Sequence, residues 1–185
     1  MNILRRYRPD LVILGLYVLL TLLLTWPMPF QMSTHLAGSS NDTYINPWAN
    51  WWTEKVIREG YDLYFTRYMF YPYGVSLTLH SFSHFNTLLW FLLRPLVGNL
   101  VAYNATVLLA YPLSGLAMFA LVRYLTNSTL GAFIAGLIFA FSPYHIVESA
   151  HPVLVTTQWL PFFLLFLIKT VRSSDRRICH ASLAL

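Results

Sequence analysis

The sequence predicts an all-α integral membrane protein. We expect a bundle of about four spanning helices with the beginning of a fifth, and a long first external loop with juxtamembrane helices. Of the 185 residues, 57% are hydrophobic and 10% are charged, whereas soluble domains carry about 25% charged residues. Several apolar runs approach the length of about 20 residues that crosses a bilayer, and lysine and arginine gather in alternate loops. These observations exclude a soluble domain, a disordered chain and a protein that binds nucleic acid through a basic surface.

The first expected spanning helix covers 11–30 and follows the basic segment 5–8. A basic start before an apolar run is also typical of a cleaved signal peptide. This run is longer than a signal core, however, and the Trp-Pro-Met-Pro sequence at 26–29 lacks the small residues of a cleavage site. We therefore interpret the segment as an uncleaved anchor helix.

Three later runs are long enough to span the membrane, at 100–122, 129–146 and 154–171. The run at 82–97 is shorter and contains polar residues, so we interpret it as a juxtamembrane or re-entrant segment. The last residues, 178–185, resemble a helix that has just begun. We therefore expect one membrane domain over 1–185 that forms the amino-terminal part of a larger module.

The basic residues predict the orientation of the chain. If 82–97 stays on one side of the membrane, eight of them fall in the cytoplasm and three fall outside; if it crosses, the excess is reversed. The first arrangement is favoured, so we expect a cytoplasmic N-terminus and an extracytoplasmic loop at 31–81. The eight are Arg5, Arg6, Arg8, Arg123, Lys169, Arg172, Arg176 and Arg177, and the three are Lys55, Arg58 and Arg67.

The external loop 31–81 contains an amphipathic pattern. Apolar residues recur at helical spacing, and a polar stripe that ends in a Glu54–Arg58 ion pair lies on the other side. The three tryptophans within five residues suit the headgroup region. We expect a helix over 45–59 that lies on the membrane surface and ends at Gly60. The apolar residues are Ile45, Trp48, Ala49, Trp52 and Val56, and the polar stripe is Asn46, Asn50, Glu54 and Arg58.

Two other parts of this loop have alternative interpretations. The aromatic residues between 61 and 73 either form a belt at the membrane interface or bind a sugar or an isoprenoid chain. The turn at 38–43 is rich in glycine and serine and contains Asp42. Either Asp42 or Thr43 is the N-cap of the next helix, or Asp42 is a carboxylate at the mouth of a membrane cavity, able to take a proton from a hydroxyl group.

Polar residues also gather in the second external loop. His145, Glu148 and His151 follow one another at a spacing of three and would share a face if the loop is helical. The spacing is compatible with a metal ion but is not a standard zinc signature, so we interpret these residues as a polar rim and predict no metal. Gln158, at the outer end of the next helix, either lines the same cavity or caps the helix.

An ordered series of short motifs over about 20–170 resembles the GT-C glycosyltransferase superfamily of bacterial and archaeal membrane proteins, which is related in plan to protein mannosyltransferases and to aminoarabinose transferases of lipid A. No single motif is specific; their order carries the resemblance. The motifs are Thr25-Trp-Pro27, Gly38-x-x-x-Asp42, Asn46-Pro-Trp-Ala-Asn-Trp-Trp52, Phe70-Tyr-Pro-Tyr-Gly74, Ala102-Tyr-Asn104, Leu113-Ser-Gly115, Phe139-Ala-Phe-Ser-Pro-Tyr144 and Thr157-Gln-Trp-Leu-Pro161.

The resemblance implies transfer of a hexosyl or pentosyl group from a polyprenyl phosphate to an unknown acceptor, without a cofactor, at the outer face of a prokaryotic cytoplasmic membrane. The family's general base is an acid in the first external loop, which maps onto Asp42. Many relatives carry two adjacent acids there, whereas this chain has Asn41 first. Arg67, Arg94 and the external histidines offer cations for the departing phosphate. The expected substrate-binding residues are Asn41, Asn46, Trp48, Arg67, Tyr71, Tyr73, His80, His84, His145, Glu148, His151 and Gln158.

A second class of function remains open from the sequence. A non-catalytic membrane protein, either a transporter subunit or an envelope assembly scaffold, would use the aromatic loop to bind lipid or a partner. Transporters place ionisable residues in the middle of their spans, and none of the three later spans has an Asp, Glu, Lys or Arg near its centre. The sequence therefore favours the enzyme over the transporter.

Overall fold

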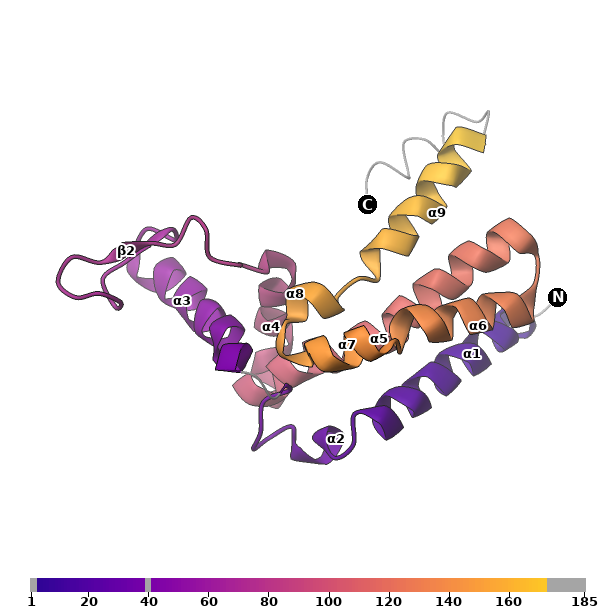
Figure 1. The fold of residues 1–185 in the computed structure, drawn as a ribbon, viewed down its shortest axis with the longest axis horizontal. Coiled ribbons are helices and arrows are strands. Elements are labelled where there is room, and N and C mark those ends of the chain that lie inside the picture. The colour runs from indigo at the N-terminus through magenta and orange to yellow at the C-terminus, as the bar shows by residue number, and fades with distance from the viewer. Residues whose placement is uncertain (1–2, 39–40, 173–185) are drawn as a thin grey trace.

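The computed structural model describes residues 3–38 and 41–172, and this part of the chain is mostly helical (Figure 1). Three helical stretches within it are long and apolar enough to cross a membrane: Asn99–Thr126, Thr129–Ala150 and Pro152–Arg172. The expected start of another helix at 178–185 lies outside the described residues. The described part thus provides three candidate spans, where the sequence predicted about four.

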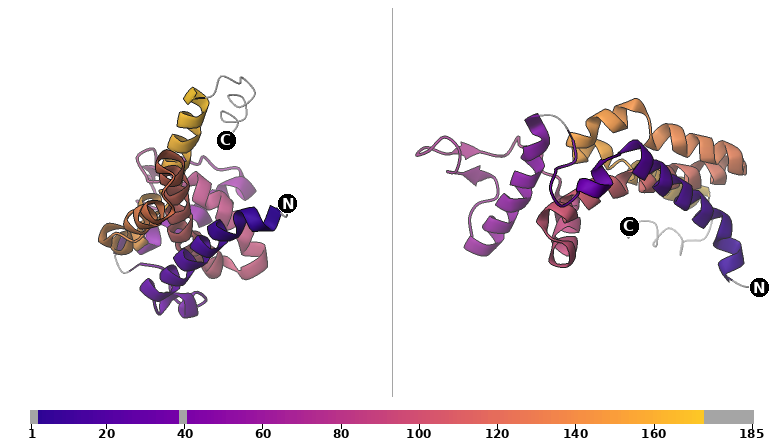
Figure 2. Two further views of the ribbon diagram at one scale, coloured as in Figure 1. Left: turned by 90° about the vertical axis from the view of Figure 1, so that its right-hand side faces the viewer. Right: turned by 90° about the horizontal axis from the view of Figure 1, so that it is seen from below.

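The long helix α5 (Asn99–Thr126) is the centre of the bundle. Helices α1 (Ile3–Leu24), α4 (His84–Val97), α6 (Thr129–Ala140) and α9 (Trp159–Arg172) all pack against it. The views agree that α1, α5 and α6 run side by side, whereas α9 diverges from them beyond α8 (Figures 1 and 2). Because α5 contacts every other long bundle helix, its side chains decide how the bundle closes.

Small residues let α1, α5 and α6 approach closely. Tyr17 of α1 is fully buried, and its hydroxyl donates a hydrogen bond to the Phe133 carbonyl of α6 at 3.0 Å. A Cβ atom at Gly136 would lie 2.0 Å from the Tyr17 hydroxyl oxygen and 2.6 Å from the Gly115 carbonyl oxygen. These two glycines therefore make room for the tyrosine, as small residues do where membrane helices meet.

The expected first span, 11–30, is wrong in its boundary. Helix α1 ends at Leu24, a turn follows, and the short helix α2 covers Met28–Gln31. Proline lacks a backbone N–H and disfavours helical geometry in the residue before it, so Pro27 and Pro29 account for the break. The apolar part of α1, Asp10–Leu24, is thus shorter than the three candidate spans.

Prolines also interrupt the helices expected at 129–146 and 154–171. Helix α6 ends at Ala140, and the short helices α7 (Pro143–Val147), η2 (Glu148–Ala150) and α8 (Pro152–Val155) follow before α9 begins at Trp159. Each of the helices α7 and α8 begins with a proline, whose missing N–H is harmless in a first turn. The chain consequently changes direction twice between α6 and α9, and the polar residues at 145–151 lie on these short pieces.

The segment 31–81 contains the expected helix and a hairpin that the sequence did not predict. Helix α3 covers Ile45–Glu59, after the 3-10 turn η1 (Asn41–Tyr44), and Gly60 ends it in a left-handed conformation with φ 73°. The boundaries expected from the amphipathic pattern are confirmed. Strands β1 (Phe65–Thr66) and β2 (Val75–Ser76) then pair in antiparallel register.

Helix α3, helix α4 and the hairpin form a layer across one end of the bundle. Helix α3 runs across the direction of α5, and the hairpin extends from α3 on the side away from the bundle (Figures 1 and 2). Helix α4 lies between them and the bundle, packed on α5. At about 1.5 Å per residue, its 14 residues rise about 21 Å, short of the hydrocarbon core of about 30 Å.

One buried amide fixes the loop between α2 and η1. The Asn104 side chain of α5 is fully buried. Its carbonyl oxygen accepts from the Ala37 N–H at 2.9 Å, and its amino group donates to the carbonyls of Met32 at 2.8 Å and His35 at 2.7 Å. The loop backbone is thereby satisfied by one side chain of the central helix.

Replacing Asn104 by alanine tests this anchor. The change leaves an N–H and two carbonyls of the loop without their partner, and each unsatisfied buried group costs about 1–3 kcal/mol. We expect Asn104→Ala to lower the free energy of unfolding by about 3 kcal/mol, measured by denaturant titration in lipid nanodiscs. Asn99→Ala, on an exposed residue of the same helix, is the control; equal stability of the two variants would contradict the anchoring role.

Candidate functional site

The structure brings together three predicted residues from two loops. The Nε2 atom of His151 lies 3.4 Å from an Asp42 carboxylate oxygen, and its Nδ1 atom lies 2.7 Å from a Glu148 carboxylate oxygen. The Asp42 side chain is 57% exposed, whereas those of Glu148 and His151 are partly buried. A histidine thus bridges an open carboxylate to a more sheltered one.

Close packing of the two loops produces this meeting. Gly38 has φ 104°, and a Cβ atom there would lie 2.5 Å from the Ala150 Cα atom. A side chain at position 38 would therefore push the first loop away from η2. Asn104 holds the loop just before Gly38, and the turn η1, which contains Asp42, lies next to His151.

The geometry of this triad defines its protonation chemistry. Both ring nitrogens of His151 face carboxylate oxygens, and carboxylates accept hydrogen bonds when ionised. The Asp42–His151–Glu148 group is therefore a row of two carboxylates joined by one imidazole, with the Asp42 carboxylate exposed to solvent.

The N-cap interpretation of Asp42 is wrong for helix α3. The N-cap of α3 is Tyr44, with no side-chain capping hydrogen bond, and Asp42 lies in the first turn of η1. Thr43 is buried in the same turn. Asn41 begins η1 and is the neighbour of Asp42.

His145 does not join the triad. It is buried, and its ring nitrogens lie 3.1 Å from the Ala140 carbonyl oxygen and 3.2 Å from the Thr157 hydroxyl oxygen. The shared face expected for residues 145, 148 and 151 would need one continuous helix, but α7 ends at Val147. The ring instead ties the end of α6 to the segment before α9.

Gln158 is also inside the bundle rather than on a polar rim. Its side chain is buried, and its Oε1 atom has no hydrogen-bond partner in the described part of the chain. It immediately precedes helix α9, which begins at Trp159. Neither Gln158 nor His145 is placed to contact a substrate held at Asp42.

Three other predicted residues form an aromatic row beside α3. The Trp48 ring lies 5.6 Å from that of His80, His80 lies 4.8 Å from Phe82, and Phe82 stacks on His84 at 5.6 Å. Burial lowers the pKa of His80, which favours its neutral ring. Trp48, His80 and His84 are therefore brought together, in a row that offers ring faces rather than positive charge.

The polar stripe of α3 packs against α4, not toward solvent. Asn46 and Asn50 are buried, and the Asn50 carbonyl oxygen accepts from the Thr87 hydroxyl at 2.7 Å. One turn further, Glu54 receives two hydrogen bonds from the Arg94 guanidinium, one of them at 2.8 Å. The expected contact of Glu54 with Arg58 is longer, at 3.7 Å. Arg94 is thus paired with Glu54, and its expected role at a phosphate stays a prediction.

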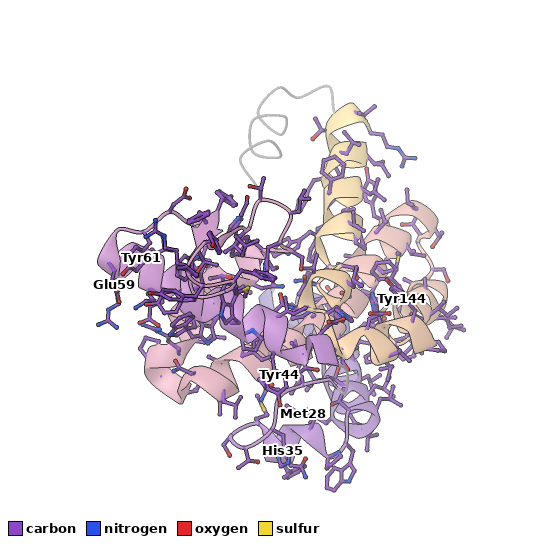
Figure 3. The ribbon with its side chains drawn as sticks, turned by 60° about the vertical axis from the view of Figure 1, so that its left-hand side comes forward. Met28, His35, Tyr44, Glu59, Tyr61 and Tyr144 are labelled. Atoms are coloured by element: carbon purple, nitrogen blue, oxygen red, sulfur yellow. The ribbon has the colours of Figure 1, made fainter. Side chains whose placement is uncertain are left out.

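The remaining predicted residues lie at the other end of α3. Arg67 follows strand β1, and Tyr71 and Tyr73 are 84% and 86% exposed at the hairpin tip. The 15 residues of α3 rise about 22 Å, and Figure 3 shows Tyr44 and Tyr61 at its opposite ends. The expected single site is therefore divided into the Asp42 triad and a separate region around Arg67.

A metal site is not evident in the structure. Within residues 3–38 and 41–172, no three or more His, Cys, Asp or Glu side chains gather as a metal site requires. In the triad the two carboxylates contact the two different nitrogens of one imidazole.

Sequence reasoning missed the residues that position the site. Asn104 appeared only as part of a short motif, although an asparagine within an apolar run signals a buried hydrogen-bonding role. The Glu54–Arg94 pair spans 40 residues, and no local pattern reveals it.

Comparisons with family models, curated proteins and solved structures find no match to this chain.

The Glu54–Arg94 pair makes the stability of the contact between α3 and α4 sensitive to acid. Hydrogen bonds from Arg94 hold the pKa of Glu54 below its usual 4.5, against the opposing effect of burial. As the pH falls below 4.5, Glu54 takes up a proton in the unfolded protein before it does so in the folded protein. The stability that the ion pair contributes above pH 4.5 is therefore lost as the pH falls through the pKa of Glu54 in the folded protein.

We expect hydrogen exchange of α3 and α4 amides to accelerate as the pH falls below 4.5, the ordinary value of the carboxyl pKa. Glu54→Gln removes the titrating group and is expected to exchange faster at pH 7 with little further change on acidification. Asp62→Asn, which removes a carboxylate outside both helices, serves as the control and keeps the wild-type profile. Identical pH profiles for Glu54→Gln and the wild type would contradict the assignment.

Proposed function

We propose that this chain is a membrane glycosyltransferase, or the amino-terminal part of one, that transfers a sugar from a polyprenyl-phosphate donor to an acceptor at the extracytoplasmic face of a prokaryotic cytoplasmic membrane. The three apolar helical stretches cross the bilayer, and the layer of α3, α4 and the hairpin lies outside. The proposal rests on the residues and on their arrangement, since no relative supports it.

One observation carries the proposal: the Asp42 carboxylate is open to solvent and is backed by His151 and Glu148 at the external end of the bundle. A carboxylate that accepts a proton from a hydroxyl group works best when the proton has a further acceptor nearby. The imidazole beside Asp42 is such an acceptor, and Glu148 stabilises its charged form.

The proposed reaction balances through these groups. The acceptor hydroxyl oxygen forms a bond to the anomeric carbon while the bond from that carbon to the phosphate oxygen breaks. The phosphate leaves with the electron pair, and the hydroxyl proton passes to Asp42 and is shared with His151. No cofactor takes part in this step.

A non-catalytic transporter subunit or assembly scaffold is the second candidate. The hairpin tip favours a scaffold, because Phe70, Tyr71 and Tyr73 are at least 75% exposed on the side away from the bundle. Exposed apolar patches of this kind mark surfaces that contact partners. In a scaffold the Asp42 triad would hold the two loops together without chemistry.

The orientation is tested by cysteine labelling in intact cells. In a Cys179→Ser background, we expect Ser81→Cys, which is exposed before α4, to react with a membrane-impermeant maleimide added outside. Thr129→Cys, which is exposed at the start of α6, is expected to react after the cells are opened. The reverse pattern would place Asp42 in the cytoplasm and contradict the proposed function.

The catalytic role is tested by Asp42→Asn. Asparagine keeps the size and the hydrogen-bonding capacity of the residue but not its basicity, and general base catalysis contributes about 10²–10⁴-fold. We expect a loss of sugar transfer of at least about 100-fold with an unchanged unfolding midpoint, measured with membranes and a radiolabelled polyprenyl-phosphate sugar. Glu59→Gln is the control, because it removes an exposed carboxylate at the far end of α3. Undiminished transfer by Asp42→Asn would overturn the role of Asp42 as the base, and absence of transfer by the wild type would favour the scaffold.

A further inference from the structure

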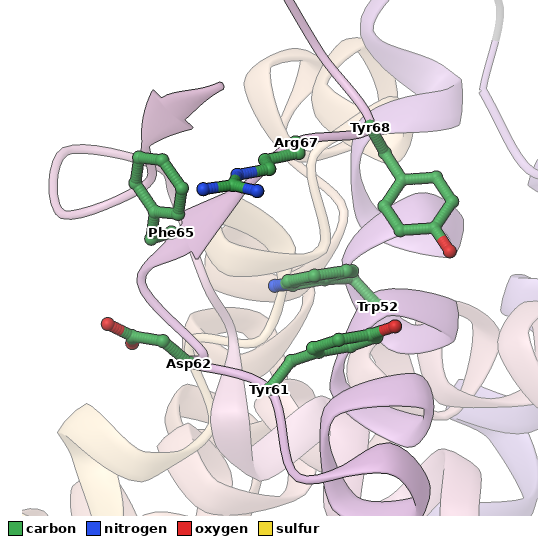
Figure 4. Close-up of a pocket in the computed structure, with 6 residues that line it drawn as sticks. All are labelled: Trp52, Tyr61, Asp62, Phe65, Arg67 and Tyr68. Atoms are coloured by element: carbon green, nitrogen blue, oxygen red, sulfur yellow. The ribbon is translucent and has the colours of Figure 1, made fainter. Parts of the chain in front are cut away.

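A cavity lies between the C-terminal end of α3 and the hairpin, apart from the Asp42 triad. It has a volume of about 440 Å³, within the range of about 300–1,000 Å³ that is typical of small-ligand pockets. Figure 4 shows the six side chains that surround it: Trp52, Tyr61, Asp62, Phe65, Arg67 and Tyr68. Four of the six are aromatic, and the two charged groups have opposite signs.

The aromatic walls of the cavity are preformed. The Trp52 ring stacks between those of Trp48 and Tyr61 with centroid distances of 6.0 Å to each, and its Nε1–H donates to the Leu63 carbonyl at 3.0 Å. Trp52 is 2% exposed, so its position is fixed by its neighbours. Tyr61, Phe65 and Tyr68 retain exposed ring surface around it.

The two charged residues of the cavity are available to a ligand. Asp62 accepts the Tyr64 N–H at 2.8 Å through one oxygen, and a carboxylate has about four acceptor sites. Arg67 is exposed and forms no ion pair within the described part of the chain. The nearby Lys55 is engaged by Glu59 at 2.6 Å. The cavity therefore presents one acceptor group and one donor group with no net charge between them.

We propose that this cavity is a carbohydrate-binding site that holds one sugar ring of an external glycan. A sugar ring has an apolar C–H face, which matches an aromatic wall, and an edge of hydroxyl groups that both donate and accept, which matches Arg67 and Asp62. A phosphate or another anion would meet the Asp62 carboxylate and is disfavoured. A purely apolar ligand would leave both charged groups without hydrogen bonds.

The bound ring is distinct from the sugar that reacts. Asp62 and Arg67, which would bind the hydroxyl groups of the ring, lie beyond the C-terminal end of α3. The 15 residues of α3 rise about 22 Å from the end near Asp42, so one ring cannot contact Asp42 and these two residues together. Under the proposed function the ring belongs to the acceptor glycan, and this identification rests on that function. Binding itself does not, because it requires neither the donor nor Asp42.

The experiment measures binding of mannotetraose, maltotetraose and chitotetraose to the chain in lipid nanodiscs, by isothermal titration calorimetry without a donor. Nanodiscs are needed because detergents with sugar headgroups would compete for the site. The variants are Arg67→Ala and Asp62→Asn, the second of which keeps the acceptor for the Tyr64 N–H. Arg58→Ala is the matched control, since its side chain is 74% exposed on α3 outside the cavity.

We expect at least one of the three glycans to bind, and each cavity variant to weaken its binding by about tenfold or more, because each removes a hydrogen bond to a charged group. Arg58→Ala and Asp42→Asn are expected to bind as the wild type does. Binding by none of the glycans, equal weakening by Arg58→Ala, or displacement by inorganic phosphate would overturn the proposal. Glycan binding by a wild-type chain that transfers no sugar from the polyprenyl-phosphate donor would refute the proposed function alone.

Discussion

The end of the bundle that carries Asp42 depends on one side-chain amide. Asn104 is fully buried in the second turn of α5, where an unpaired polar group is costly, and the loop before η1 supplies an N–H and two carbonyls that match its hydrogen-bonding groups. The loop in turn brings Gly38 against Ala150 and Asp42 toward His151. This amide therefore helps to hold together two segments that lie more than 100 residues apart in the chain.

The fold was predictable where local physics decides it. Length and apolarity indicate helices, and the amphipathic pattern over 45–59 with its terminal glycine gave correct helix boundaries. The sequence did not predict which way the polar stripe at Asn46, Asn50 and Glu54 faces, because such residues are stable both in water and against polar groups of another helix. In the structure they face helix α4. The two-residue strands are too short to produce an alternating pattern.

The candidate site was predictable as a set of residues but not as a geometry. Asp42, Glu148 and His151 stood out as polar residues in external loops, and their contact is tertiary. His145 has the same sequence spacing as its neighbours, yet the end of α7 turns it inward. Arg67 and Arg94 were grouped by their charge alone. Arg94 is paired with Glu54, 40 residues earlier in the chain, and Arg67 lies beyond the far end of the 15-residue helix α3.

The stack of Trp48, Trp52 and Tyr61 gives the layer of α3, α4 and the hairpin its own optical signal. Excitation energy absorbed by the tyrosines beside Trp52 passes to an indole that is shielded from water, and such an indole emits at shorter wavelengths than an exposed one. The chain has six tryptophans, and several of the others are more exposed. In a variant that keeps Trp52 alone, the emission therefore reports on the folding of this layer.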